Sequence, residues 1–181
     1  MSRPISVIIL AAGKGTRMGS NIPKVLHHIG DLPMISHVIN TAKKLNVEHI
    51  VPVLGYEYQK IKQELKNETL QYALQKEQLG TAHAVMQCTE ILKNFNGNIL
   101  ILYGDVPLIS SKTLESLLEV HNSQDAYATV LTTDLKNPTG YGRIIRNKNG
   151  DLAKIVEQAD ASEQELEVKE INSGIYVFKS W

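Results

Sequence analysis

Residues 7–24 read VIILAAGKGTRMGSNIPK, and this stretch decides the fold of the chain. The apolar run at residues 7–11 predicts a buried strand, and a loop with three glycines in seven positions follows soon after it. Glycine lets backbone N–H groups come close to a ligand where a side chain would block the approach. Because Arg17 and Lys24 add fixed positive charge to the same loop, the stretch predicts a phosphate-binding loop at the end of the first strand.

The glycines of this loop match neither standard phosphate-binding motif. Gly13, Gly15 and Gly19 miss the dinucleotide fingerprint, whose third glycine stands one position earlier. A Walker A loop ends in Gly-Lys-Ser/Thr, whereas Lys14 is followed by glycine. The loop is also long and has no strong periodic pattern, and such loops in compact domains are functional or disordered. A flexible turn with incidental charges is the alternative to a ligand-binding loop.

Strand and helix patterns alternate along most of the chain, which predicts right-handed βαβ units and a parallel sheet. We therefore expect one α/β domain over residues 1–181, with a Rossmann-like, mostly parallel sheet and helices on both faces. The expected later strands are residues 50–54, 70–74, 99–103, 126–132 and 175–178, and the expected helices are residues 33–45, 58–65, 80–92 and 111–121.

Two features interrupt this alternation. Pro52 removes a hydrogen-bond donor inside its strand, which argues for an edge strand or a bulge. Asn149-Gly150 predicts a hairpin between residues 143–146 and 152–156, an antiparallel insertion near one edge of the sheet. The polar residues 158–170 are expected to form a loop or a short exposed helix.

Composition narrows the classes of protein. The 181 residues include 19 basic and 19 acidic side chains, a balance that argues against a nucleic-acid binder. No stretch approaches the ~20 apolar residues of a membrane span, so we expect a cytoplasmic protein without nucleic-acid or membrane partners. Cys88 is the single cysteine and cannot form an internal disulfide, and its place in an apolar helical pattern predicts a buried thiol.

Polar residues stand where other strands end, and ligands of open α/β sheets bind beyond the carboxyl ends of the strands. Gln75 follows the third expected strand, and Gly104 and Asp105 follow the fourth. A carboxylate at Asp105 suits Mg²⁺ held against phosphate oxygens, whereas a turn or helix-capping aspartate is the alternative. The histidines and Cys88 form no recognisable zinc or nucleophile motif in the sequence.

Five motifs in order carry a resemblance to a known family. They are LAAGKGTRM with PKVL (residues 10–18 and 23–26), QKEQLGTAHA (75–84), LYGDVPLI (102–109), PTGYGRI (138–144) and EINSGI (170–175). Together they resemble the sugar-phosphate nucleotidylyltransferases, and most specifically the N-terminal uridylyltransferase domain of the bacterial bifunctional N-acetylglucosamine-1-phosphate uridylyltransferases. The resemblance covers essentially the whole chain and implies a nucleotidylyltransferase fold of the glycosyltransferase-A type.

The resemblance implies transfer of a uridylyl group from UTP to N-acetylglucosamine 1-phosphate with Mg²⁺, giving UDP-N-acetylglucosamine and pyrophosphate. It implies catalytic roles for Arg17 and Lys24, which would bind phosphates, and for Asp105, which would bind the metal. The nucleotide-binding positions that it implies are Leu10, Ala11, Ala12, Gly13, Lys24, Gln75, Gly80, Thr81, Tyr103 and Gly104. The sugar-binding positions are Gly142, Glu157 and Asn172.

These implied roles are chemically consistent. A sugar phosphate is largely dianionic at neutral pH, its second pKa being ~6, so it needs no strong general base. Its oxygen attacks the α-phosphorus of UTP in line and pyrophosphate leaves, so that positioning and charge neutralisation fall to the protein. A carboxamide such as Gln75 selects a base edge, because unpaired hydrogen-bonding groups in a rival complex are costly.

Two departures from the family pattern leave alternatives open. Ala82 stands where the family often has glycine, and the sequence ends at Trp181, before a second metal-ligating asparagine and the acetylating β-helix domain of the family. We therefore expect a truncated transferase domain with impaired turnover, monomeric without the trimer-forming β-helix. A nucleotidylyltransferase for another sugar phosphate and a non-catalytic nucleotide-sugar-binding module are the alternative functions.

Overall fold

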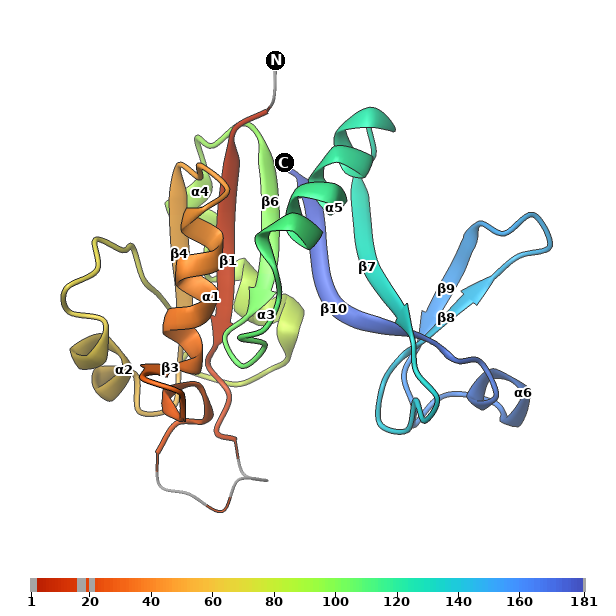
Figure 1. Ribbon diagram of the computed structural model, residues 1–181, viewed down its shortest axis with the longest axis horizontal. Helices are drawn as coiled ribbons and strands as arrows, with labels where there is room; N and C mark the ends of the chain where they lie inside the picture. Colours follow the sequence, from red (N-terminus) through yellow and green to blue (C-terminus); the bar gives the residue numbers. More distant parts are fainter. Residues whose placement is uncertain (1–2, 16–18, 20–21, 181) are drawn as a thin grey trace. The chain divides into compact units, whose positions relative to one another are not determined.

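The computed structural model describes residues 3–15, 19 and 22–180, so Arg17 lies outside the described residues. The chain forms two compact units, whose elements can be followed in Figure 1. The first unit comprises Met1–Thr129 and Val177–Trp181, and the second unit comprises Val130–Tyr176. Two strands, β7 (Ala128–Asp134) and β10 (Glu170–Lys179), pass from one unit into the other.

The first unit is a parallel sheet built around β1. Its elements in chain order are β1 (Ile5–Ala11), the 3-10 helix η2 (Lys24–Leu26), β2 (His28–Ile29), β3 (Leu32–Pro33), α1 (Met34–Lys43), β4 (His49–Leu54), α2 (Tyr58–Glu64), β5 (Ala73–Leu74), α3 (Thr81–Met86), α4 (Thr89–Leu92), β6 (Asn98–Tyr103) and α5 (Ser111–Ser123). The strand order is β5-β4-β1-β6, followed by β10. β1 pairs in parallel with β4 and β6, and β4 pairs in parallel with β5.

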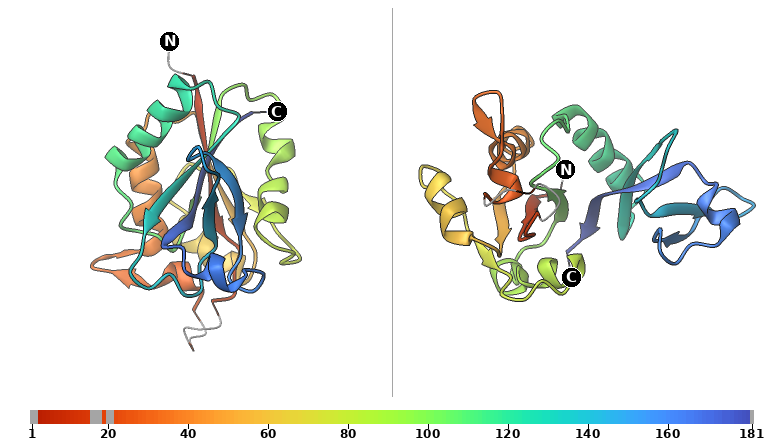
Figure 2. Two further views of the ribbon diagram at one scale, coloured as in Figure 1. Left: turned by 90° about the vertical axis from the view of Figure 1, so that its right-hand side faces the viewer. Right: turned by 90° about the horizontal axis from the view of Figure 1, so that it is seen from below.

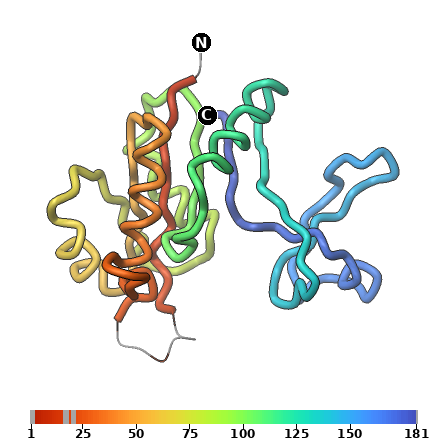
Figure 3. The backbone as a smooth tube through the Cα atoms, in the orientation of Figure 1, coloured from red at the N-terminus to blue at the C-terminus, as the bar shows by residue number. Residues whose placement is uncertain are grey.

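The core of the first unit lies on both faces of β1. Val7, Ile8 and Ile9 are completely buried, as their continuous apolar run predicts. α1 and α5 cover one face of the sheet, and α3 and α4 cover the other (Figure 2; the tube in Figure 3 follows the same path). Ser110 caps α5 by accepting a hydrogen bond from Thr113 N. The predicted parallel sheet with helices on both faces is confirmed.

Pro52 lies inside β4, which has β1 on one side and β5 on the other. The predicted edge position is therefore wrong, and the backbone explains why proline is tolerated. Leu54 O accepts from Gln75 N, so the backbone N–H and C=O of Leu54 face β5. Backbone polar groups alternate between the two sides of a strand, so those of Pro52, two residues earlier, face the same side. β5 pairs only with Val53 and Leu54, so the missing N–H of Pro52 precedes that ladder.

The single helix predicted over residues 80–92 is two short helices, α3 and α4, and that prediction is wrong. Thr89 Oγ1 donates to Met86 O (2.8 Å), which satisfies one of the last carbonyls of α3 and ends the helix. Cys88 N donates to Val85 O (3.0 Å), a tighter turn than an α-helix makes. The Cys88 side chain is completely buried, as predicted.

The second unit is built on antiparallel pairing. Besides its parts of β7 and β10 it contains β8 (Arg143–Arg146), β9 (Leu152–Val156) and α6 (Glu163–Leu166). β8 lies between β10 and β9, and β7 pairs with β10. The hairpin predicted at Asn149-Gly150 is confirmed, with Gly150 at φ +87°. α6 confirms the predicted short helix.

β10 begins at Glu170, five residues before the predicted strand. The prediction missed residues 170–174 because they mix polar side chains with glycine and lack a strand pattern. Gly174 adopts φ +80° within the strand, a conformation that other residues rarely take. Ser173 Oγ donates to Leu131 O (2.6 Å), which helps to hold this irregular part of the strand. In the described part of the chain, every helix is too short or too polar to cross a membrane.

Candidate functional site

The carboxyl ends of β1 and β6 are joined at Gly104. Its N–H donates to Leu10 O (2.9 Å), just beyond the pairing of Leu10 with Tyr103. A Cβ at Gly104 would lie 3.2 Å from Val25 Cγ1 and 3.3 Å from Leu10 O, so a side chain there would fit only tightly between η2 and the end of β1. The segment that follows β1 and the segment that follows β6 therefore lie side by side, as expected for the carboxyl ends of neighbouring parallel strands.

Lys24 and Asp105 form an ion pair at this junction. Lys24 Nζ donates to Asp105 Oδ2 at 2.6 Å. Lys24 begins η2, and its neighbour Val25 is buried against the strand ends, which fixes the backbone from which the lysine extends. The side chains are 41% and 27% exposed, so both charges remain accessible to a ligand from solvent. An ammonium beside a carboxylate suits a phosphate chain and a metal ion bound to it.

The glycines of the loop after β1 have different roles. Gly15 has φ +62°, and a Cβ there would lie 2.7 Å from Lys24 Cβ, so this position packs directly on the lysine. At Gly13, by contrast, a Cβ would have no other atom within 4 Å, so the space beside this residue is open. Gly15 therefore serves the packing of the protein, whereas Gly13 leaves room for a ligand.

Gln75 is held rigidly at the end of β5. It is 3% exposed, and its backbone N–H donates to Leu54 O (2.8 Å). Its Nε2 donates to Gly80 O (3.1 Å) and contacts His83 Nδ1 (3.0 Å). Because an amide nitrogen only donates, His83 Nδ1 is the acceptor and its proton is on Nε2 in the neutral ring. Both hydrogens of the amide are used, which leaves Oε1 as the atom to offer a ligand.

Gly80 and Thr81 lie at the start of α3, beside Gln75. Gly80 has φ +103° and no atom within 4 Å of a Cβ position, so a side chain there would be strained and would enter open space. Thr81 is the first residue of α3. The structure thus brings Gln75 next to the start of α3 at Gly80 and Thr81, and a nucleotide-binding role for these residues stays a prediction.

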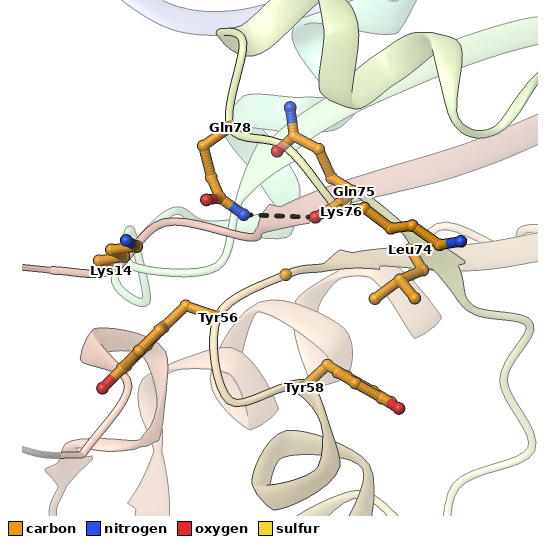
Figure 4. Close-up of a pocket in the computed structure, with 8 residues that line it drawn as sticks. Lys14, Tyr56, Tyr58, Leu74, Gln75, Lys76 and Gln78 are labelled. Atoms are coloured by element: carbon orange, nitrogen blue, oxygen red, sulfur yellow. Dashed lines mark hydrogen bonds between the residues drawn. The ribbon is translucent and has the colours of Figure 1, made fainter.

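A pocket of about 380 Å³ opens beside this region (Figure 4). Gln78 Nε2 donates to Gln75 O (3.3 Å) at its rim, and the Gln75 carboxamide points away from the two tyrosines that line the other side. The lining residues are Lys14, Gly55, Tyr56, Tyr58, Leu74, Gln75, Lys76 and Gln78. Among the described residues the lining includes two lysines and no acidic side chain, so the pocket favours anionic ligands.

The three predicted sugar-binding residues lie together in the second unit. Asn172 N donates to Gly142 O (2.9 Å), which places the start of β10 beside the segment before β8. A Cβ at Gly142 would lie 3.0 Å from Glu157 Oε1, so the carboxylate stands directly over the glycine. Asn172 Oδ1 accepts from Gly174 N (2.9 Å), which fixes the carboxamide and leaves Nδ2 as its donor.

The sequence is similar to those of known proteins over nearly its whole length. The model of the nucleotidyl transferase family matches residues 6–181. The chain belongs to this family. It is 50% identical over 171 residues to the bifunctional protein GlmU of Bacillus mycoides and, over the same length, 50% identical to that of Geobacillus thermodenitrificans. Each match covers 94% of this chain and 37% of the relative, so the chain spans little more than a third of the relatives it matches.

The fold is also similar to a solved structure. The chain aligns with a Bacillus anthracis protein, assigned as a glucose-1-phosphate thymidylyltransferase and solved with sucrose, at a TM-score of 0.80 and 23% identity. The alignment covers 97% of this chain and 71% of that structure. At this identity the likeness supports the nucleotidyl transferase fold alone.

Within this fold, the metal-ligating side chains of the described residues form no group of three or more. Asp105 offers its carboxylate beside Lys24. Cys88 is no candidate nucleophile, because burial raises the pKa of its thiol to about 12 and keeps it protonated. Arg17, which the sequence places with Lys24, lies outside the described residues.

Sequence reasoning missed several residues at this site. Gly55 lies so close to Ala12 that a Cβ would come within 2.7 Å of Ala12 O, and Tyr56 N donates to that same oxygen (3.3 Å). The available signal was a glycine directly after the buried run of β4, the same pattern that drew attention to Gly104. Tyr56, Tyr58 and Lys76 carried no such signal, because exposed tyrosines and lysines after a strand are common.

Proposed function

We propose that this chain transfers a uridylyl group from UTP to N-acetylglucosamine 1-phosphate, giving UDP-N-acetylglucosamine and pyrophosphate. The observation that carries the proposal is the Lys24–Asp105 ion pair at the ends of β1 and β6, next to a loop with open space at Gly13. Membership of the nucleotidyl transferase family and 50% identity to bifunctional GlmU proteins support it.

The first unit would bind UTP, with the base read by Gln75. Because Nε2 of Gln75 is committed to Gly80 and His83, only Oε1 remains to accept a hydrogen bond from the base. Uracil has an N–H donor at N3, where cytosine has an acceptor, so the fixed carboxamide would reject CTP. Three further segments would enclose the nucleotide. They are the backbone of residues 10–13, the start of α3 at Gly80 and Thr81, and the carboxyl end of β6 at Tyr103 with the Gly104 that follows it.

Asp105 offers a donor set that fits a magnesium ion. Mg²⁺ typically takes one or two carboxylates and fills its remaining positions with water and substrate phosphates. Asp105 is a single, partly exposed carboxylate whose Oδ2 is bound by Lys24, an arrangement that leaves Oδ1 for a metal. When bound there, the ion would neutralise charge on the phosphates of UTP.

The second unit would bind the sugar. Glu157 offers two acceptor oxygens for sugar hydroxyls, and Asn172 offers the Nδ2 donor that its other bonds leave unused. Gly142 leaves room in front of the carboxylate, because any side chain there would meet Glu157. Acceptors and a donor around a small open space suit a polyhydroxylated ring.

The charged residues of the chain would then promote the transfer by neutralisation and positioning. The sugar phosphate supplies its own nucleophilic oxygen, since it is largely dianionic at neutral pH with a second pKa of ~6. Lys24 and Arg17 would hold the phosphates of UTP while that oxygen attacks the α-phosphorus and pyrophosphate leaves. The proposal therefore requires no general base.

The test is an assay of pyrophosphate release with four nucleoside triphosphates and a panel of sugar 1-phosphates. We expect the highest kcat/KM for UTP with N-acetylglucosamine 1-phosphate, at least about 100-fold above that for CTP. Preference for another sugar phosphate would make the chain a different nucleotidylyltransferase. Calorimetric binding of UDP-N-acetylglucosamine with no pyrophosphate release would instead indicate a non-catalytic binding module.

A further inference from the structure

Arg143 is a buried cation in the second unit. Arg143 is 2% exposed and is among the largest buried side chains of the described residues. Nη1 donates to Tyr141 O, and Nη2 donates to Gln158 Oε1 (2.9 Å). Both acceptors are neutral, and Nε has no hydrogen-bond partner among the described residues.

Burying a guanidinium in this way is unfavourable for stability. Removing a charge from water is costly, and well-packed apolar residues of similar volume often replace buried charged groups without loss of stability. Neutral acceptors and an unpartnered Nε compensate the cost only in part. An arginine at this position is therefore better explained by geometry than by stability, because its planar fork fixes two acceptors relative to each other.

The two acceptors lie on the segments that carry the proposed sugar-binding residues. Tyr141 directly precedes Gly142, and Gln158 directly follows Glu157. Gln158 Oε1 accepts a second hydrogen bond from Gly140 N (3.1 Å), so one carboxamide oxygen joins the segment before β8 to the segment after β9. The antiparallel pairing of Arg143 with Val156 already brings Gly142 opposite Glu157, with 3.0 Å between a Cβ position at Gly142 and Glu157 Oε1. This connection lies directly beside that pair, at residues 140, 141 and 158.

We propose that Arg143 and Gln158 form a clamp that positions Gly142 and Glu157 for the sugar phosphate. Both are positioning residues, because they act through the backbone of residues 140–142 and through Glu157 rather than on substrate. The inference rests on the proposed function for the identity of the ligand. The clamp itself rests on the hydrogen bonds of the second unit, so it predicts an effect on the sugar phosphate and none on UTP.

The test compares Gln158→Leu with Gln158→Glu. Leucine removes the acceptor for both Gly140 N and Arg143 Nη2, whereas glutamate keeps a carboxylate oxygen for each. We expect Gln158→Leu to raise the KM for the sugar phosphate about tenfold and to leave the KM for UTP within about twofold, since two hydrogen bonds are lost, one of them a partly buried bond from a charged group. Gln158→Glu should restore the KM for the sugar phosphate to within about twofold of the wild-type value.

Arg146→Gln is the matched control in the same unit. It removes the partly exposed ion pair with Glu170 (2.6 Å) and leaves the hydrogen bonds of Gln158 in place, so both KM values should stay unchanged. The clamp is overturned if Gln158→Leu binds the sugar phosphate normally, or if Gln158→Glu is as impaired as the leucine variant at equal thermal stability. Using Gln158 keeps the test valid even if Arg143 variants do not fold.

Amide exchange at Gly140 separates this inference from the proposed function. Loss of the Gln158 acceptor should speed exchange of the Gly140 N–H at least about tenfold in Gln158→Leu and not in Gln158→Glu. If the wild-type chain transfers nothing, the proposed function fails, and the clamp still stands or falls on this measurement. Unchanged protection of Gly140 in Gln158→Leu would overturn the clamp whatever the activity.

Discussion

The candidate sites of the two units are fixed in different ways. In the first unit the geometry depends on glycines packed against the backbone or against Lys24, because a Cβ at Gly15 or Gly55 would come within 2.7 Å of another atom. In the second unit it depends on side chains that are present, since Arg143 and Gln158 hold the segments around Gly142. The first arrangement exposes backbone and fixed charge, which suits phosphates. The second arranges individual acceptors and donors, which suits a sugar ring.

The largest expected effect comes from removing the charge that the first site presents. Asp105→Asn should lower the rate of pyrophosphate release by at least about 100-fold, because a carboxylate that would hold the metal becomes a neutral amide. The fold should tolerate the change, since a partly exposed ion pair such as Lys24–Asp105 contributes only ~0–1 kcal/mol. Turnover assays and thermal melting together test this, and undiminished turnover would make Asp105 a turn residue.

Two alanine substitutions in the loop after β1 test the dependence on glycines. Gly15→Ala should cost about 1–2 kcal/mol from its left-handed backbone, with a further cost from the contact with Lys24. Gly13→Ala should leave stability unchanged, because its Cβ would enter open space, and yet weaken UTP binding by occupying that space.

Thermal melting and calorimetric titration with UTP distinguish the two alanine variants. The comparison between the units fails if Gly15→Ala is as stable as the wild type, because the loop would then not pack on Lys24 as the structure has it. UTP binding that is unaffected by Gly13→Ala would remove Gly13 from the ligand site while leaving the packing argument for Gly15 intact.

The sequence predicts those parts of the fold that depend on local patterns. Long apolar runs identified β1 and β6, and Asn149-Gly150 identified the hairpin, because each signal is contained in a few adjacent residues. The break between α3 and α4 was missed, since it depends on whether the Thr89 hydroxyl bonds to Met86 O or to solvent. The edge position predicted from Pro52 was wrong because the neighbouring strand β5 is short. β5 pairs only with Val53 and Leu54, so a missing N–H at Pro52 breaks no hydrogen bond to it.

For the site, the sequence indicated which strand ends carry polar residues, and the roles of those residues remain predictions. The ion pair between Lys24 and Asp105 follows from the parallel order of β1 and β6, which brings their carboxyl ends together. The burial of Arg143 had no local signal, since arginine before an apolar strand reads as an exposed residue. Its position follows only from the pairing of β8 with strands on both sides.

Cys88 gives a smaller effect that reports on the first unit alone. Burial raises the pKa of its thiol from 9.0 to about 12, so at pH 8 the thiolate fraction falls about 1,000-fold and alkylation of the folded protein should slow accordingly. Because the unfolded thiol ionises first, this contribution to stability is present below pH 9 and is lost as pH rises toward 12. Mass spectrometry of alkylated protein measures the rate, and equal rates in native and unfolded protein would contradict the buried position.

The smallest expected effect is a local loosening of the second unit in acid. The hydrogen bond from Lys154 on β9, then those from the backbone and hydroxyl of Ser162, lower the pKa of Glu165 to about 2. Since the folded pKa lies below the unfolded value, this stabilisation is present above pH 4.5 and is lost as pH falls toward 2. The partners of the carboxylate are Lys154 on β9 and Ser162 at the start of α6, so the change should be confined to α6 and its contact with β9. An NMR titration of the Ser162 amide should therefore show a midpoint near 2, and Glu165→Gln should abolish the titration. A midpoint at the ordinary value of 4.5 would mean that neither the Lys154 hydrogen bond nor the capping box is formed in solution.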